Sequence, residues 1–253
     1  MTAGMLVAYA LTGVIGVLLG ALGSGGAILM LPLLVYVAKM PATQAVPLSM
    51  AVVALSSFAG ASQYIRRGAF SPRLMLVFGA GGMSGAFAGA QFTRFLSEPV
   101  LMSMISALLV TVGTMMLRGR HFTTCANPCL PPRCALIAFG IGLLTGFLGV
   151  GGGFLLVPAL MRFAGLDQRS AAGTSLGLIS LNAMAGLAGQ LRHTQIDWLA
   201  ASFFLIACLW GLSGGVYLST RLPENRLRRA FAWLLVTIGA GVGAATVARA
   251  LVN

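Results

Sequence analysis

Two glycine clusters interrupt the apolar sequence and are the residues best suited to hold a ligand. They cover residues 23–26 and 149–153, and each precedes a short apolar segment of helical character. A helix that begins there presents unpaired backbone N–H groups and the positive end of its dipole, and glycine lets a small anion come close to them. The alternative is that the glycines only allow tight helix packing. We favour an anion site at Gly23, Ser24, Gly25, Gly26, Gly149, Val150, Gly151, Gly152 and Gly153.

Polar side chains on two further apolar segments could complete this site. Ser49 and its counterpart Ser175, with neighbouring Thr174, lie early in these segments, and Ser56 and Asn182 follow seven residues later. Seven residues are about two helical turns, so each pair shares one helix face. Hydroxyl and amide groups can bind the oxygens of an anion or the backbone of a neighbouring helix. The matched placement of these residues favours binding.

Acid–base and metal chemistry find little support in the sequence. There are four acidic residues, and each stands at the start of a predicted helix, where it can act as a cap. Because none is left for the bilayer interior, the sequence disfavours a cation carrier. His121 and His193 both fall in predicted loops, which disfavours an enzyme. We expect no catalytic residue, no metal site and no cofactor. The acidic residues are Glu98, Asp167, Asp197 and Glu224.

The cysteines leave one question open. Cys125, Cys129 and Cys134 are spaced unlike any standard zinc site, so we interpret them as reduced thiols without a role, although a metal or redox function stays open. Cys208 falls in an apolar segment and is interpreted as a small hydrophobic residue.

The composition indicates that the elements carrying these residues lie in a membrane. Hydrophobic residues make up 58% of the 253 residues, charged residues make up 8%, and the mean hydropathy is +0.95. A soluble domain of this length has about a quarter charged residues. The net charge of +12 is spread in small groups between apolar stretches, where it can orient a chain in a bilayer. We therefore expect lipid, and no nucleic acid, as a partner.

A shift of 126 residues aligns the chain with itself. The shift places Gly20, Pro32 and Glu98 on Gly146, Pro158 and Glu224, and it matches residues 108–111 with 234–237 without a gap. One register kept over about a hundred residues indicates an internal repeat. We place the first transmembrane repeat at 1–118, a cytoplasmic linker at 119–133 and the second transmembrane repeat at 134–253.

Each repeat contains five predicted helical segments. The third, fourth and fifth are long enough to cross a bilayer, whereas the second is too short in both repeats and the first is too short in the second repeat. The glycine clusters separate the first segment from the second. The predicted segments are 5–22, 26–38, 43–65, 74–94 and 99–117, followed by 135–148, 153–164, 170–191, 198–219 and 230–248.

The distribution of basic residues distinguishes two topologies. If the first two segments form one broken spanning helix, the sixteen Lys and Arg residues divide evenly between the two faces. If they form a hairpin that returns to its starting side, only Lys39, Arg94, Arg192 and Arg249 remain on one face, as the positive-inside rule requires. We therefore predict an all-α polytopic membrane protein of two inverted five-segment repeats. Each repeat has a broken, re-entrant helical hairpin and three spanning helices, and both chain termini lie outside the cytoplasm. Paired helix breaks in inverted repeats are typical of secondary transporters that bind substrate near the midplane.

The same glycine motifs carry a resemblance to a known family. The sequence LGALGSGG at 19–26, followed by Leu31-Pro32, resembles the N-terminal motif of the TauE/SafE family of sulfite and organosulfonate exporters. The sequence GFLGVGGG at 146–153, with AGTS at 172–175, is similar to the counterpart in the second half. The resemblance covers nearly the whole chain. It implies a transporter, and by its name an exporter, of a small sulfur-containing anion such as sulfite, a sulfonate or thiosulfate in a bacterial inner membrane.

An anion channel of the same fold is the main alternative to a carrier with alternating access, and an intramembrane enzyme is disfavoured. The residues themselves leave open the identity of the anion, the direction of transport, a coupling ion and assembly into a homo-oligomer.

Overall fold

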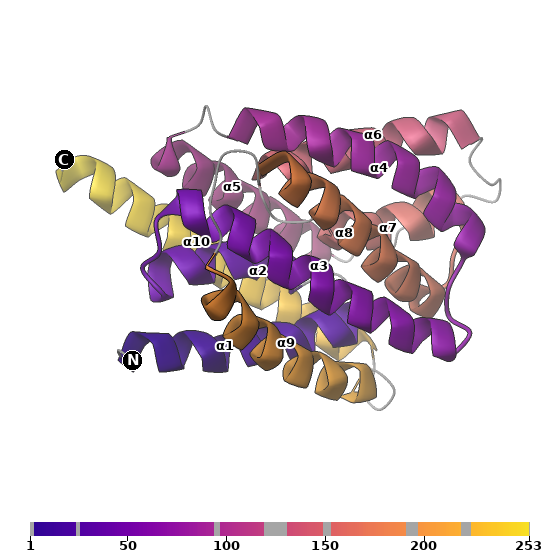
Figure 1. Cartoon of the computed structure of the whole chain (residues 1–253), viewed down its shortest axis with the longest axis horizontal. Helices are drawn as coiled ribbons and strands as arrows, with labels where there is room; N and C mark the ends of the chain where they lie inside the picture. Colours follow the sequence, from indigo (N-terminus) through magenta and orange to yellow (C-terminus); the bar gives the residue numbers. More distant parts are fainter. Residues whose placement is uncertain are drawn as a thin grey trace.

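The computed structural model describes residues 3–23, 26–93, 97–118, 131–148, 153–190, 197–218 and 224–252, and in these ranges every regular element is helical (Figure 1). The ten predicted segments are confirmed, with ends that differ by a few residues. The elements are α1 (Ala3–Leu22), α2 (Ala27–Pro32), η1 (Leu33–Val37), α3 (Ala42–Arg66), α4 (Pro72–Thr93), α5 (Glu98–Leu117), α6 (Pro131–Leu148), α7 (Gly153–Ala164), α8 (Gln168–Gln190), α9 (Trp198–Leu218) and α10 (Glu224–Val252).

Five described helices, namely α3, α4, α5, α8 and α9, are long and apolar enough to cross a membrane. We also predict that α10 crosses the membrane. It has 29 residues, and the described part Ala232–Thr246 is apolar. Large apolar side chains such as Leu76, Phe58 and Trp210 are exposed on the outside of the bundle, as lipid-facing positions are. The chain is a multi-pass membrane protein.

Two parallel helix pairs join the repeats through glycines. Gly16 and Gly20 of α1 face the backbone of α9 so closely that a Cβ atom would overlap the carbonyl groups of Cys208 and Leu212. Gly142 and Gly146 of α6 face the backbone of α4 in the same way, as the 126-residue shift requires. From the other side, Gly81, Gly85 and Gly89 of α4 pack so closely that a Cβ would overlap the α6 backbone. In Figure 1, α4 and α6 run along one edge of the bundle and α1 and α9 along the opposite edge.

Two other pairs join equivalent helices of the two repeats. Helices α3 and α8 pack between these edges, and α5 packs against α10. Gly60 of α3 faces Leu176, whereas Met50, earlier on α3, faces Gly186, later on α8, so the two helices run antiparallel. In the second pair, the Ser106 hydroxyl donates to the Gly239 carbonyl at 2.7 Å. Because Gly113 meets Val236 while Gly239 meets Leu109, α5 and α10 are also antiparallel.

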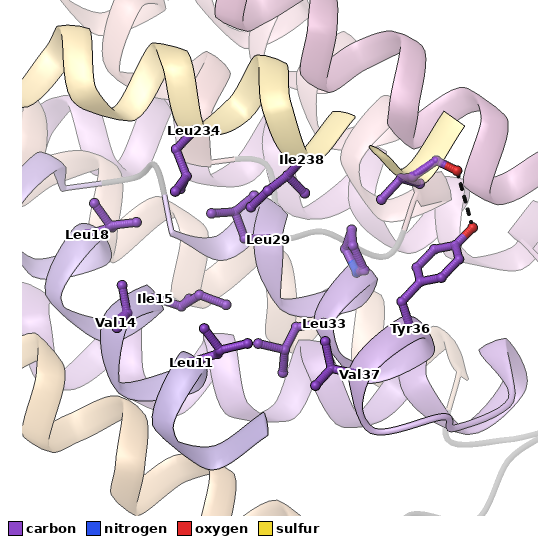
Figure 2. A pocket seen from close by; sticks show the side chains of 12 residues that line it. Leu11, Val14, Ile15, Leu18, Leu29, Leu33, Tyr36, Val37, Leu234 and Ile238 are labelled. Carbon is purple, nitrogen blue, oxygen red and sulfur yellow. Dashed lines mark hydrogen bonds between the residues drawn. The ribbon is translucent and has the colours of Figure 1, made fainter. Parts of the chain in front are cut away.

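The short segment α2–η1 folds back along α1. Gly26 packs on the backbone of Ile15 and Leu19, and Leu33 and Val37 lie near Leu11 further back towards the start of α1 (Figure 2). Proline has no N–H to continue the α-helical ladder, and from Pro32 onward the helix widens into the π-helical turn η1.

Helix ends follow from local sequence. The Asp197 carboxylate accepts hydrogen bonds from the N–H groups of Leu199 and Ala200, both at 3.0 Å, which confirms its predicted role as a cap. Asp167 caps α8 in the same manner, because its carboxylate accepts from the Ser170 N–H at 3.4 Å. The helices after the two breaks end at equivalent residues with positive φ, which are Lys39 at 54° and Gly165 at 67°.

Candidate functional site

The structure describes only the residues that border the candidate anion site. Ser24, Gly25 and residues 149–152, all predicted to bind the anion, lie outside the described residues. Gly153 is the first residue of α7, and Gly23 and Gly26 border the first break. The residues that follow the two breaks come together, because α2 contacts α7.

Gly23 is held in place by the second repeat. Its φ of 73° lies in the left-handed region that favours glycine, and a Cβ there would overlap Ala172 of α8. The Ser175 hydroxyl lies 2.8 Å from the Gly23 carbonyl oxygen and 2.8 Å from that of Ala172, so it can donate to either. The Tyr64 hydroxyl donates to the Gly20 carbonyl at 3.1 Å, one turn earlier. Two of the predicted site residues, Gly23 and Ser175, are therefore in direct contact, and sequence reasoning missed the contribution of Tyr64.

Gly26 lies deeper in the bundle, at the start of α2. All six residues of α2 are buried, and a Cβ at Gly26 would overlap the Ile15 carbonyl of α1. Close packing alone therefore requires glycine at both described positions of the first cluster. These contacts support the packing interpretation at Gly23 and Gly26, whereas anion binding by the cluster stays a prediction.

The hydroxyl groups early in α3 and α8 support the backbone. The Ser49 hydroxyl donates to the Val46 carbonyl at 2.8 Å, and the Thr174 hydroxyl oxygen accepts from the Ser71 N–H at 3.0 Å. Thr174 thereby fixes the turn before α4. Both side chains are buried.

The polar pair near the middle of the core helices is unequal. Ser56 donates to the Val52 carbonyl at 2.7 Å and lies within hydrogen-bonding reach of the Cys208 thiol of α9. In the second repeat, Asn182 takes the place of Ser56 and Gly82 of α4 takes the place of Cys208. The larger amide fills the space that glycine leaves, since a Cβ on Gly82 would lie 2.6 Å from the Asn182 Oδ1 atom. Sequence reasoning selected Ser56 and Asn182 but missed their partners on α9 and α4.

Negative charge is absent from the described spanning segments of the bundle. Asp167 and Asp197 are exposed at the starts of α8 and α9. Hydrogen bonds from Ser170, the largest effect, hold the pKa of Asp167 below its ordinary value, because they favour the charged carboxylate. Among the described residues, no group of three or more His, Cys, Asp or Glu side chains is placed to hold a metal ion.

An apolar groove opens beside the hairpin and was not predicted. Its volume is about 280 Å³, and it lies between α1, α2–η1 and α10 (Figure 2). At one end, the Tyr36 hydroxyl donates to the Val242 carbonyl at 3.4 Å (dashed line in Figure 2). It also lies 2.8 Å from the Thr246 hydroxyl, so these contacts link η1 to α10. A lining of aliphatic side chains offers nothing to bind an anion. The lining residues are Leu11, Val14, Ile15, Leu18, Leu29, Pro32, Leu33, Tyr36, Val37, Leu234, Ile238 and Val242.

In this multi-pass helical bundle, two short helices that each follow a glycine cluster contact one another. This arrangement is typical of membrane transport proteins. The model of the family described as "Sulfite exporter TauE/SafE" matches residues 8–242. A "Probable membrane transporter protein" of Xylella fastidiosa is 30% identical over 236 residues, which cover 89% of this chain and 90% of the relative. "Probable membrane transporter protein YdhB" of Bacillus subtilis is 25% identical over 85% of this chain and 91% of its own length. No solved structure matches the chain.

The chain belongs to the TauE/SafE family, and the resemblance seen in its glycine motifs is thereby confirmed. It is a membrane transporter and not an enzyme, as the sequence led us to expect.

Proposed function

We propose that the protein is a secondary transporter that exports a small sulfur-containing anion, such as sulfite, a sulfonate or thiosulfate, by alternating access. The family supports this class of substrate. The contact of α2 with α7, the two short helices that follow the glycine breaks, is the observation that carries the proposal. It brings the two segments least able to span a bilayer next to each other inside a bundle of spanning helices.

The relative directions of the helices support an inverted arrangement of the two repeats. Helix α3 is antiparallel to its equivalent α8, and α5 is antiparallel to its equivalent α10. Equivalent helices that pack antiparallel are related by a twofold axis perpendicular to them, which in a bilayer is an axis in the membrane plane. The return of α2–η1 along α1 supports the re-entrant hairpin.

The anion binds near the midplane between residues 23–26 and 149–153, held mainly by backbone N–H groups. The glycine-rich sequence of both clusters and the absence of a carboxylate in the described spanning segments favour negative charge there. Ser175 and Tyr64 position the first break through its carbonyl groups. Ser49, Thr174, Ser56 and Asn182 line or support the path on the core helices.

The orientation follows from the basic residues. The linker at 119–133 faces the cytoplasm of a bacterium, and both chain termini lie on the other side of the inner membrane. The start of α1 and the end of α10 lie at the same end of the bundle in Figure 1, which supports a common side for the two termini.

Flux measurements in proteoliposomes test the proposal. Gly25→Val and Gly151→Val should abolish sulfite transport, because a β-branched side chain keeps the anion away from the amides and disfavours the backbone angles that glycine allows. Ser24→Ala should reduce transport only moderately, since it keeps its N–H group. Gly214→Val is the control, because a Cβ at Gly214 meets no atom within 4 Å.

Normal transport by a well-folded Gly25→Val or Gly151→Val variant would place the site elsewhere. A carrier should release its anion faster when anion is also present on the opposite side of the membrane. A channel of the same fold would show no such trans-stimulation.

A further inference from the structure

We propose that Asn182 contacts the transported anion, and that this anion carries a hydrogen-bond donor in addition to its acceptor oxygens. Hydrogen sulfite, with its O–H group, has this chemistry, and so do the sulfonate ends of zwitterionic amino-substituted sulfonates together with their ammonium group. The inference rests on the proposed function and narrows its class of substrate.

Unpaired polar atoms in the bundle carry the inference. Asn182 is 1% exposed, and neither its Nδ2 nor its Oδ1 atom has a hydrogen-bond partner among the described residues. The Ser57 hydroxyl is buried and unpaired as well. A buried donor or acceptor without a partner destabilises a protein, and a polar side chain inside a membrane usually marks a substrate path.

The position of Asn182 agrees with a substrate path. The contacts of Met50 with Gly186 and of Gly60 with Leu176 bracket the crossing of α3 and α8, and Asn182 lies between these levels. Ser57 lies on the opposite helix within about one helical turn of the same level. Both unpaired groups are therefore close to the centre of the paired helices α3 and α8. Asn182 lies two turns along α8 from Ser175, whose hydroxyl donates to the Gly23 carbonyl.

The first repeat shows that packing does not require an unpaired amide here. At the equivalent position, Ser56 satisfies its hydroxyl on its own helix and lies beside the buried Cys208 thiol. The second repeat instead combines a glycine at residue 82 with a longer side chain that ends in both a donor and an acceptor. An asymmetric polar group that the fold does not need is best explained by an asymmetric ligand.

The chemistry of the amide then selects the ligand. The Asn182 Nδ2 group can donate to an oxygen of any sulfur anion, but the Oδ1 atom only accepts. A fully deprotonated dianion such as sulfite, sulfate or thiosulfate offers Oδ1 only oxygens or sulfur that repel it. An anion with one O–H group, or a zwitterionic sulfonate with one ammonium group, satisfies both atoms of the amide at once.

The test measures transport and thermal unfolding of purified protein with Asn182→Leu, which has a similar volume and no polar atom. We expect a loss of transport of about tenfold or more, as for a lost hydrogen bond to a charged ligand, with an unfolding temperature equal to or above that of the wild type. Thr12→Val is the control, since Thr12 is buried but bonds only the Ala8 carbonyl of its own helix. It should keep transport within about twofold, because its hydroxyl bond adds only a modest net free energy.

Substrate panels separate the two donor-bearing classes. The wild type should transport hydrogen sulfite or taurine in preference to sulfate and thiosulfate. Raising the pH through the range in which hydrogen sulfite loses its proton should abolish its transport but leave that of taurine unchanged.

Normal transport by Asn182→Leu, or equal wild-type transport of donor-free dianions, would overturn the inference and assign the amide to a bound water. Absence of wild-type flux for every sulfur anion would instead overturn the proposed function, and the inference with it.

Discussion

Two neighbouring glycines on α9 allow the packing between the repeats to be measured. A Cβ added at Gly215 would overlap the Val17 carbonyl oxygen of α1, whereas a Cβ added at Gly214 would meet no atom within 4 Å. Replacing either glycine by alanine adds the same atoms to the same helix, at positions one residue apart. The two variants differ only in whether the added Cβ atom meets the neighbouring helix α1.

The expected magnitudes follow from two opposing effects. Alanine stabilises a helix by about 1 kcal/mol relative to glycine, and this gain should be visible in full for Gly214→Ala. At Gly215→Ala the same gain is opposed by overpacking, which costs about 3 kcal/mol when the obstacle is backbone that cannot rotate away. We therefore expect Gly214→Ala to be about 1 kcal/mol more stable than the wild type and Gly215→Ala about 2 kcal/mol less stable.

Unfolding in detergent, followed by tryptophan fluorescence against temperature or added denaturing detergent, measures the difference of about 3 kcal/mol between the variants. The equivalent position on α4, Gly89, faces Leu143 of α6 and should respond like Gly215. Equal stability of the Gly214→Ala and Gly215→Ala variants would refute the close approach of α1 and α9, and with it the way in which the two repeats are joined.

Three further predictions concern helix ends. Asp197→Ala should lower the free energy of unfolding by about 1 kcal/mol and leave sulfite flux intact; loss of flux in folded protein would contradict a purely structural cap. The pKa of Asp167 is lower in the folded state, so its contribution to stability is complete above its ordinary value and is lost as the pH falls through the folded value. A pH titration of the unfolding temperature should therefore show a smaller loss in acid for Asp167→Asn, and equal losses would refute the argument. Lys39→Gly should stabilise the protein and Gly165→Ala should destabilise it, each by about 1 kcal/mol, because both residues have positive φ; effects of the same sign in thermal unfolding would contradict this.

The sequence predicted the elements well because the repeat doubled each signal. The predicted ends at 38 and 164 are equivalent positions in the two repeats, and in the structure each is followed by a residue with positive φ, Lys39 or Gly165.

The candidate site was less predictable, since its important contacts cross between the repeats. A shift of the sequence shows that Ser56 and Asn182 are equivalent, but it cannot show that Cys208 and Gly82 are their neighbours. The structure shows that the small Ser56 lies beside Cys208, whereas the larger Asn182 lies beside Gly82, so the sizes of the two neighbours compensate. The apolar groove beside Tyr36 was missed for the same reason, because α1, η1 and α10 meet only in three dimensions.

The crossed pairing of the repeats also dictates the order of assembly during synthesis. Gly16 of α1 is translated long before Cys208 of α9, the residue against which it packs. At bacterial rates of elongation this separation corresponds to roughly ten to forty seconds, during which the glycine face of α1 lacks its α9 partner. The α9 helix of a second nascent copy fits that face equally well. Exchange of helices between two copies is therefore limited by how soon each ribosome delivers α9, and not by the stability of the finished bundle.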